Sequence, residues 1–258
     1  MKPEERTEIL ALLDLERQTL FSPGTTVISE MGLIRDMSDD GKQCNILYSC
    51  CPEDELDRII KHQIENARSA RYELEWKLYG HDRPHDLGER LAAAGFEAGA
   101  REAFMVLTAS EEALDRFGVC NSDIRRVTGK EGLEDVRLIS EEVHGRSYEW
   151  RFKQWRAALE KDPDSLCIYV VYVNGEPAAS GRLCILEGSR FAGLYGGETR
   201  ERFRKRGLYK QLVAARIRQA LSQGITRICV DALPTSEPIL RKRGFEFVTY
   251  TQPFCISE

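Results

Sequence analysis

Apolar positions recur along the chain with two periods, one helical and one alternating, and the changes between them mark the predicted elements. Helical spacing predicts helices over residues 1–21, 53–70, 86–94, 131–144, 148–161, 206–223 and 237–242. Short runs rich in β-branched and aromatic residues predict strands over residues 25–31 with 33–34 beyond, 44–48, 72–79, 103–107, 124–128, 166–173, 178–186, 191–195, 227–232 and 245–251. This order predicts an α/β (α+β layered) fold with a mixed, mostly antiparallel sheet flanked by helices.

Turn residues separate these elements. Ser22-Pro23-Gly24 ends the first helix, and Asp162-Pro163 ends the helix over 148–161, because proline cannot continue a helix. Asn174-Gly175 lies between two apolar runs and predicts a tight hairpin.

The two halves of the chain repeat one order of elements: a long helix, a strand, a short helix, a Gly-Phe pair and a closing strand. The Gly-Phe pairs are Gly95-Phe96 and Gly244-Phe245. This repetition predicts two tandem copies of one fold, with domains at residues 1–118 and 121–258. Two unrelated α/β domains, or one domain with an α/β lid, are the alternatives.

Composition and charge limit the classes of function. The chain has 37 Lys and Arg against 42 Asp and Glu, a net charge of −5, which argues against bulk nucleic-acid binding. No apolar run approaches the ~20 residues that cross a bilayer. The charged first residues contain no apolar stretch of the kind found in signal peptides. We therefore expect a cytoplasmic protein without a membrane partner.

Cysteine and histidine spacing does not indicate a metal site. The 8 cysteines form no CxxC pair, so neither a zinc ribbon nor a redox motif is predicted. The segment His81-Asp82-Arg83-Pro84-His85 contains two histidines, but Pro84 breaks the helix that would align them. We interpret this segment as a loop and expect no metal.

The most informative stretch follows the strand over 191–195. Five Arg or Lys residues lie among the seven residues 200–206, and Gly207 and a helix come directly after them. Backbone N–H groups at a helix N-terminus lack intrahelical acceptors and lie at the positive end of the helix dipole. The pattern therefore predicts a phosphate site, with a solvated run of charges as the alternative. No G-x-x-x-x-G-K-[ST] P-loop is present.

The segment Arg204-Lys205-Arg206-Gly207-Leu208-Tyr209 resembles the Arg/Gln-x-x-Gly-x-Gly/Ala signature of the GNAT acyl-CoA N-acyltransferase superfamily. Tyr209 departs from that signature, in which the last residue is small. The apolar strand over 227–232 and the ending Pro238 to Phe245 also resemble the closing part of that fold. The resemblance implies that acetyl-CoA is the cosubstrate and that no metal is needed.

The resemblance also implies which residues contact the cofactor. The backbone of Gly197, Glu198 and Thr199 would meet the pantetheine arm, and the pyrophosphate would be surrounded by Arg204, Lys205, Arg206, Gly207, Leu208 and Tyr209. The corresponding position in the first half is acidic, with Glu53, Asp54 and Glu55 before the helix. We therefore predict that the N-terminal copy is degenerate and does not bind CoA.

The side chains that often catalyse the reaction in this family are absent from their usual positions in this chain. In the family, a carboxylate base, an Asn and a Tyr acid are often found at the positions that are Gly193, Leu233 and Leu240 here. Tyr195 follows Gly193 by two residues and shares its strand face, which makes it a candidate acid or water-relay residue. Ser236 and Asp231 flank the closing helix and are further candidates. For each, packing or helix capping is the alternative role.

These features predict an acetyl-CoA-dependent N-acetyltransferase in which an amine attacks the thioester directly. The expected acceptor is a small-molecule or peptide amine, and the expected state is a monomer or homodimer. One alternative is a non-catalytic acyl-CoA-binding or sensing protein that has kept the cofactor loop. Another is a phosphate-binding protein of unrelated fold.

Overall fold

The structure is a computed structural model that describes residues 1–258 except 23, 119–120, 148, 162–166 and 257–258. Several predicted features fall on residues outside this part: the turn at Pro23, the domain boundary after residue 118, the helix start at Tyr148, its end at Asp162-Pro163, and the strand start at Leu166. Among the described residues, no helix has both the length and the apolar character needed to span a bilayer.

The first half begins with a helix and continues as a strand-rich layer. Its elements are α1 (Pro3–Thr19), β1 (Thr25–Glu30), β2 (Leu33–Ser38), β3 (Gln43–Ser49), α2 (Leu56–Ala70), β4 (Glu73–Tyr79), α3 (Leu87–Ala93), β5 (Glu97–Ala98), β6 (Glu102–Thr108) and α4 (Glu111–Asp115).

The second half repeats that strand-rich layer, but two helices lie between its first two strands. Its elements are β7 (Asp123–Arg126), α5 (Lys130–His144), α6 (Glu149–Lys161), β8 (Cys167–Val173), β9 (Glu176–Cys184), β10 (Phe191–Thr199), the 3₁₀ turn η1 (Glu201–Phe203), α7 (Leu208–Ser222), β11 (Arg227–Ala232), α8 (Glu237–Arg241) and β12 (Glu246–Ile256). The described strands form one 12-stranded sheet, so the predicted mixed, mostly antiparallel fold is confirmed.

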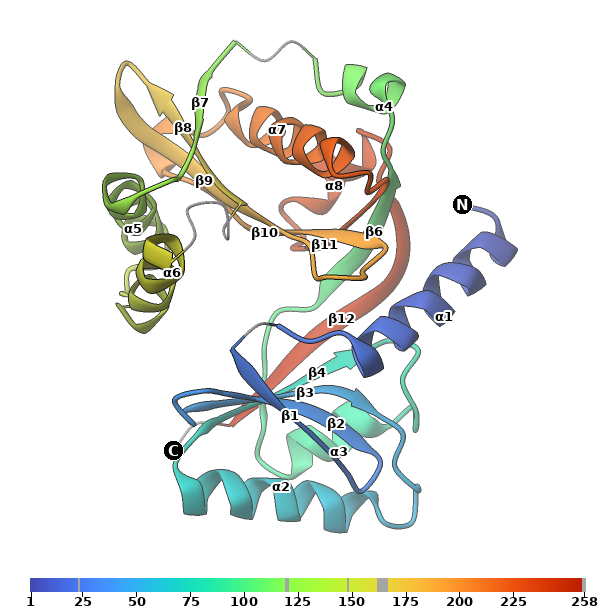
Figure 1. Cartoon of the computed structure of the whole chain (residues 1–258). Coiled ribbons are helices and arrows are strands. Elements are labelled where there is room, and N and C mark those ends of the chain that lie inside the picture. The colour runs from blue at the N-terminus through green and yellow to red at the C-terminus, as the bar shows by residue number, and fades with distance from the viewer. Residues whose placement is uncertain (23, 119–120, 148, 162–166, 257–258) are drawn as a thin grey trace.

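Each half repeats a parallel strand pair joined by a helix. In the first half β3 pairs in parallel with β4 through α2, and in the second half β10 pairs in parallel with β11 through α7. The closing strand of each half does not join its own pair. β6 pairs with β11, β12 pairs with β4, and β6 and β12 pair with each other at the centre of the sheet. Figure 1 shows these two strands running between the upper and lower layers.

This exchange of closing strands was not anticipated by the sequence, which predicted two halves that each complete their own sheet. Most strands were predicted, because alternation is a local signal, but β5 was missed and β2 was predicted only over residues 33–34. The pairing partner was not predicted, because β6 and β12 are both long apolar strands and either one fits beside either parallel pair. The extent of some elements also differs, since β10 continues to Thr199 and β12 to Ile256.

Helices cover both faces of the sheet. The outer face carries α2 and α3 in the first half and α7 and α8 in the second, and it packs the two largest apolar clusters. The inner face carries α1, α5 and α6. Strand β8 shows the consequence: Ile168 and Val170 pack with α5 and α6, whereas Tyr169 and Val171 pack with the residues of α7. A strand covered on both faces is apolar throughout, as the sequence of β8 is.

Helix α1 is fixed to the inner face by a buried ion pair. The guanidinium of Arg17 donates to both carboxylate oxygens of Asp82, at 2.8 and 2.9 Å, and its Nε donates to the carbonyl of Leu47 at 2.8 Å. Asp82 lies near Asp14 and His81, with potential metal-ligand atoms within 4.8 Å of one another. Because Arg17 already supplies a cation to Asp82, we interpret this group as an ion-pair network.

The strand exchange predicts that a residue near the C-terminus stabilises the first half. Phe254 of β12 is buried among the residues of β4 and α3, in the cluster that contains Trp76 and Leu91. Phe254→Ala should lower the free energy of unfolding by about 3–5 kcal/mol, measured by urea denaturation. Its exposed neighbour Cys255 is the control, and Cys255→Ala should change stability by less than about 0.5 kcal/mol. Equal effects of the two variants would contradict the pairing of β12 with β4.

Candidate functional site

A gap opens in the sheet between β10 and β11. The two strands pair only from Phe191 to Gly193, and β10 then turns away through a bulge between Tyr195 and Glu198. Gly196 lies in this bulge with a φ of 55°, a conformation that glycine adopts without a steric penalty. Gly196 and Gly197 therefore lie where β10 separates from β11.

Backbone groups of β10 face this gap. The N–H of Arg200 donates to Ala178 of β9 at 3.0 Å. Because backbone groups alternate in direction along a strand, the N–H and C=O of Thr199 point away from β9 and into the gap. The carbonyl of Thr199 accepts a hydrogen bond from Nε of Arg204 at 3.1 Å. The end of β10 and the cationic loop thus meet at the mouth of the gap.

The loop before α7 presents backbone donors. Lys205 and Gly207 have φ values of 63° and 78°, and α7 starts directly afterwards at Leu208. Within the described part of the chain, no acceptor is found for the backbone N–H groups of residues 205–208. These donors lie at the N-terminus of a 15-residue helix, where the helix dipole favours an anion.

The basic residues of the loop fall into two groups. Arg200 is buried and donates to Glu142 at 2.6 Å and Glu176 at 3.1 Å, and Arg202 also pairs with Glu176. These two cations, which were not among the predicted cofactor contacts, are held by carboxylates of the second half. Arg204, Lys205 and Arg206 have no carboxylate partner among the described residues. Their charges remain available for an anion.

One further cation was missed by the sequence analysis. Lys210 lies in the first turn of α7 and folds back over Gly207, where a Cβ would lie 3.0 Å from its Cε. A spacing of three residues on a helix start brings such a side chain back toward the loop.

The departure at Tyr209 has a structural counterpart on β10. A Cβ at Gly197 would lie 2.7 Å from the Tyr209 ring, so the ring packs directly against the strand backbone. Burial raises the pKa of Tyr209, while Arg216 and the hydroxyl of Ser236 lower it. The large residue at 209 is thus accommodated by the absence of a side chain at 197.

Arg216 fixes the bulge from the outer face. It is 1% exposed, and its Nη1 donates to the carbonyls of Arg182 at 3.1 Å and Tyr195 at 3.3 Å. Burial lowers its pKa to about 10, partly offset by Tyr209. The guanidinium fits because Gly181 has no side chain, since a Cβ there would lie 2.8 Å from Cζ of Arg216. A cation that binds carbonyls across the bulge holds β10 in its open shape.

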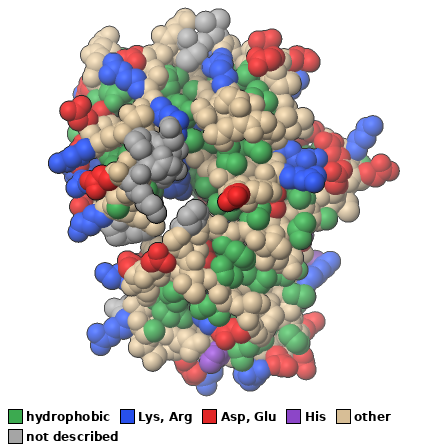
Figure 2. Space-filling model, viewed as in Figure 1, with side chains coloured by type: hydrophobic (Ala, Val, Ile, Leu, Met, Phe, Trp, Pro, Cys, Tyr) green, Lys and Arg blue, Asp and Glu red, His purple; other side chains and the backbone are tan. Residues whose placement is uncertain are grey.

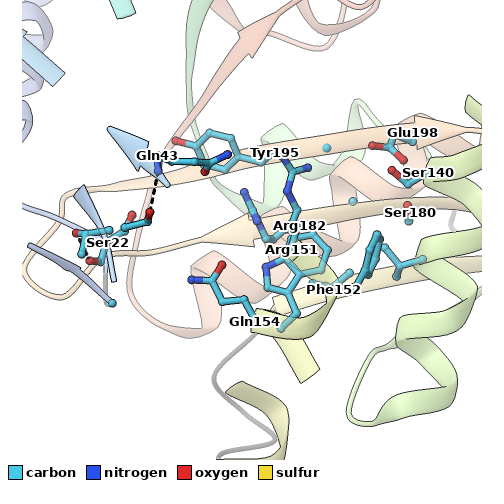
Figure 3. Close-up of a pocket in the computed structure, with 18 of the residues that line it drawn as sticks. Ser22, Gln43, Ser140, Arg151, Phe152, Gln154, Ser180, Arg182, Tyr195 and Glu198 are labelled. Atoms are coloured by element: carbon cyan, nitrogen blue, oxygen red, sulfur yellow. Dashed lines mark hydrogen bonds between the residues drawn. The ribbon is translucent and has the colours of Figure 1, made fainter. Parts of the chain in front are cut away.

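Two cavities lie on the inner face beside the bulge, where the two halves meet (Figure 2). The larger, of about 500 Å³, extends between β2 and β3 of the first half and α5 and α6 of the second. The smaller, of about 350 Å³, extends under α1. The two share lining residues, which are Ser22, Asp36, Arg182 and Tyr195. Figure 3 shows Arg182 and Tyr195 in the middle of the larger cavity.

Tyr195 takes the space that a side chain at Gly193 would occupy. A Cβ at Gly193 would lie 2.5 Å from its ring and 3.1 Å from its hydroxyl oxygen. Burial raises the pKa of Tyr195, with Cys229 the next contributor, so the hydroxyl stays protonated at neutral pH. Sequence and structure thus agree that both positions share one strand face. The structure adds that the Tyr195 hydroxyl lies close to where the family's carboxylate is often found.

Of the other candidate positions, Asp231 lines the smaller cavity, whereas Ser236, Leu233 and Leu240 line neither cavity. Ser236 is at the start of α8, where its hydroxyl donates to the carbonyl of Leu233 at 3.1 Å without a side-chain cap bond to the helix. The predicted N-cap bond of Ser236 is therefore absent. Leu240 is fully buried in the outer core, and the side chain of Leu233 is exposed.

A carboxylate beside the bulge was missed by the sequence analysis. Glu198 lines the larger cavity, and its Oε1 lies 3.0 Å from Nε2 of His144 on α5. Its Oε2 is buried without a hydrogen-bond partner. The sequence analysis predicted only a backbone contact between Glu198 and the pantetheine arm. It did not consider the Glu198 carboxylate, because the family's carboxylate base is often found at the position of Gly193.

A polar cluster forms the floor of the smaller cavity. Lys77 of β4 pairs with Asp231 of β11, and Thr251 of β12 donates to Asp231 at 2.8 Å. Beside it, burial raises the pKa of Glu102 to about 7, and the negative charge of Asp231 adds to that effect. Asp231 is therefore tied into a network, and Glu102 is a group that titrates near neutral pH.

The corresponding gap of the first half is filled. β3 pairs with β4 only from Gln43 to Ile46, and the carbonyl of Leu47, just beyond, accepts from Arg17. A cavity of about 460 Å³ near the start of α2 is lined by residues that include Glu53 and Asp86. Glu53 and Asp86 both pair with Arg90. Among the described residues, the start of α2 therefore has no cluster of unpaired cations like the one before α7.

Comparisons with known proteins agree with this geometry. The model of the Acetyltransferase (GNAT) family matches residues 130–245. A conserved protein of unknown function from Staphylococcus epidermidis has a similar structure, with a TM-score of 0.68, 15% identity, and coverage of 92% of this chain and 96% of that one. A GCN5-related N-acetyltransferase from Kribbella flavida has a TM-score of 0.64 and 14% identity, covering 98% and 94%.

A tandem GNAT protein from the clavulanic acid biosynthesis pathway is also similar, with a TM-score of 0.62 and 14% identity over 98% of this chain and 94% of that one. No curated protein matches this chain. At these identities the similar structures show the fold, which spans both halves. The prediction of a phosphate-binding protein of unrelated fold is therefore wrong.

The contact between Gly197 and Tyr209 yields a prediction about stability. Gly197→Ala should destabilise the protein by about 1–3 kcal/mol in urea denaturation, because the new methyl group overlaps the buried ring. In a Tyr209→Ala background the same change should cost less than about 0.5 kcal/mol. Gly196→Ala is the control: its cost of about 1 kcal/mol arises from positive φ and should persist in that background. Additive effects at 197 and 209 would disprove the contact.

Proposed function

We propose that this chain, which belongs to the GNAT superfamily through residues 130–245 and has the fold of a tandem GNAT protein, transfers an acetyl group from acetyl-CoA to an amine. The observation that carries the proposal is the loop before α7. Three cations without carboxylate partners among the described residues, Arg204, Lys205 and Arg206, adjoin free backbone N–H groups at the mouth of the gap.

In this proposal the loop binds the pyrophosphate of CoA. Arg204, Lys205 and Arg206 supply charge, and the N–H groups of residues 205–208 supply donors. The pantetheine arm then passes between β10 and β11, where the free N–H of Thr199 faces it. This path leads from the outer face to the bulge, so the thioester lies beside the inner cavities.

The reaction needs three groups. A neutral amine attacks the thioester carbonyl, a backbone N–H of β10 that faces the gap, near Gly197 or Thr199, stabilises the oxyanion, and the C–S bond breaks as the thiolate leaves. We assign Tyr195 as the acid that protonates the thiolate, because its side chain lines both cavities beside the bulge. The buried Oε2 of Glu198 is the candidate acceptor for the proton of the ammonium. Ser236 is a second candidate acid.

The first half has a different part in this proposal. Its own gap is filled by the Arg17–Asp82 pair and its loop is acidic, which supports the prediction that it does not bind CoA. It instead supplies one wall of both inner cavities through residues of β2 and β3. The acceptor is an amine that enters between the halves.

A non-catalytic acyl-CoA-binding protein is the second candidate. It is favoured by one observation: at the three positions where the family often carries catalytic side chains, this chain has Gly193, Leu233 and Leu240, and Leu240 is buried in the core. Alignment of the two substrates can still supply much of the rate, so these residues do not exclude catalysis.

Binding of acetyl-CoA tests the first part of the proposal. Arg204→Ala combined with Gly207→Asp should raise the Kd for acetyl-CoA by about 100-fold or more in calorimetry, because a charge-assisted hydrogen bond is lost and a carboxylate enters the anion site. Arg202→Ala is the matched control in the same loop and should leave the Kd within about twofold, since Arg202 pairs with Glu176. Unchanged affinity in the double variant, with its fold verified by circular dichroism, would rule out the site.

Thiol release tests the chemistry. With acetyl-CoA and a panel of amines, Tyr195→Phe and Glu198→Gln should each lower kcat by about 100-fold while leaving acetyl-CoA affinity unchanged. The phenylalanine and glutamine variants keep size and packing, so a loss of kcat reports the lost proton transfer. Tight acetyl-CoA binding by the wild-type protein without release by any amine would favour the non-catalytic alternative.

A further inference from the structure

Arg182 of β9 lies where the two inner cavities meet. Its guanidinium lies between two aromatic rings, 5.2 Å from the centroid of Trp155 and 5.4 Å from that of Tyr195. Such stacking holds a guanidinium in one plane and leaves its N–H edge pointing outward. Figure 3 shows the side chain directed into the larger cavity, beside Arg151.

This guanidinium has no anionic partner. Among the residues that the structure describes, no carboxylate lies within ion-pair distance of Arg182, and its Nε is buried without a hydrogen bond. The buried arginines of the described chain each have a partner: Arg17 pairs with Asp82, Arg35 with Glu30 and Arg200 with Glu142 and Glu176, and Arg216 donates to backbone carbonyls. An arginine that is stacked, partly desolvated and unpaired in a cavity has the form of a carboxylate receptor.

The position of Arg182 connects that receptor to the acceptor. It lies on the inner face, whereas the phosphate loop opens at the mouth of the gap. Across the same cavities lies Asp36 of β2, which is buried and accepts a hydrogen bond from Asn45 at 2.8 Å. Among the charged residues that line both cavities, the first half contributes Asp36 and the second half contributes Arg182. A molecule with an ammonium and a carboxylate complements both groups.

Resting on the acetyltransferase function proposed above, we infer that the acceptor is an amine that carries a carboxylate, such as a free amino acid, and that Arg182 binds this carboxylate. Arg182 is then a specificity-determining residue contributed by the second half, and Asp36 of the first half faces the positively charged part of the same molecule.

The test compares acids with their amides. Thiol release is measured at saturating acetyl-CoA for free amino acids and for the matching amino acid amides, which lack the carboxylate. The wild-type protein should favour the acid by about 10- to 100-fold in kcat/KM. Arg182→Met should remove that preference by raising KM for the acid, and Arg182→Lys should restore part of it. Arg190→Met, an exposed arginine nearby, is the control and should change nothing.

Two further arms separate the possible failures. Succinyl-CoA and malonyl-CoA are tested with carboxylate-free amines: an Arg182-dependent preference for these donors would place the carboxylate on the acyl group and overturn the inference. Where no amine is acetylated, calorimetry measures amino acid binding directly. Binding that is lost in Arg182→Met upholds the inference without the reaction, and no Arg182-dependent binding overturns it. The wild-type protein and the Arg182 variants should bind acetyl-CoA with equal affinity. If none of them binds acetyl-CoA, the proposed function is refuted, whereas the inference about Arg182 is decided by the amino acid binding.

Discussion

The exchange of β6 and β12 is the constraint on which the rest of the structure depends. β4 has β3 on one side and β12 on the other, and β11 has β10 on one side and β6 on the other. The sheet therefore cannot separate into one sheet for each half without breaking the strand pairs of β6 or β12. One continuous sheet gives one rigid inner face. A residue of β2 such as Asp36 consequently keeps a fixed position relative to a residue of β9 such as Arg182, and rigid elements hold a site more accurately than loops do.

Within this continuous sheet, much of the proposed chemistry depends on backbone groups of β10 and not on side chains. The bulge of β10 needs Gly196 for its φ and Gly197 for its contact with Tyr209, and Arg216 holds the two carbonyls that define its shape. An oxyanion donor made from a strand N–H does not depend on the identity of its side chain. In the proposed reaction, the backbone geometry around the thioester therefore does not depend on a side chain at Gly193. Proton transfer then falls to side chains around the bulge, of which Tyr195 and Glu198 are the nearest titratable groups described.

Local features of the fold were predictable from the sequence, and long-range ones were not. Periodicity located the long helices and most strands, and Gly207 marked the start of α7, because each depends on neighbouring residues. The sequence gives no sign that Arg200 pairs with Glu142, 58 residues away, so the loop looked more uniformly cationic than it is. Likewise, Arg182 reads as an ordinary strand residue, and only the packing of Trp155 from α6 reveals its role. The exchange of β6 and β12 is the largest feature that the sequence did not predict. It too depends on residues that lie far apart in the chain.

The two gaps of the sheet show how the halves have come to differ. Among the residues that the structure describes, the N–H groups of residues 205–208 beside the second half's gap have no acceptor, and the cations at 204–206 have no carboxylate partner. In the first half the equivalent position is closed by Arg17, which binds both the strand carbonyl of Leu47 and the carboxylate of Asp82. That ion pair also fixes α1 against the inner face, and Leu13, Glu16 and Arg17 of α1 line the smaller cavity. The contacts that close one gap therefore build a wall of the cavity beside the other. A duplicated fold with two open gaps would lack that wall, so the asymmetry of the halves is itself what creates an enclosed space next to the bulge.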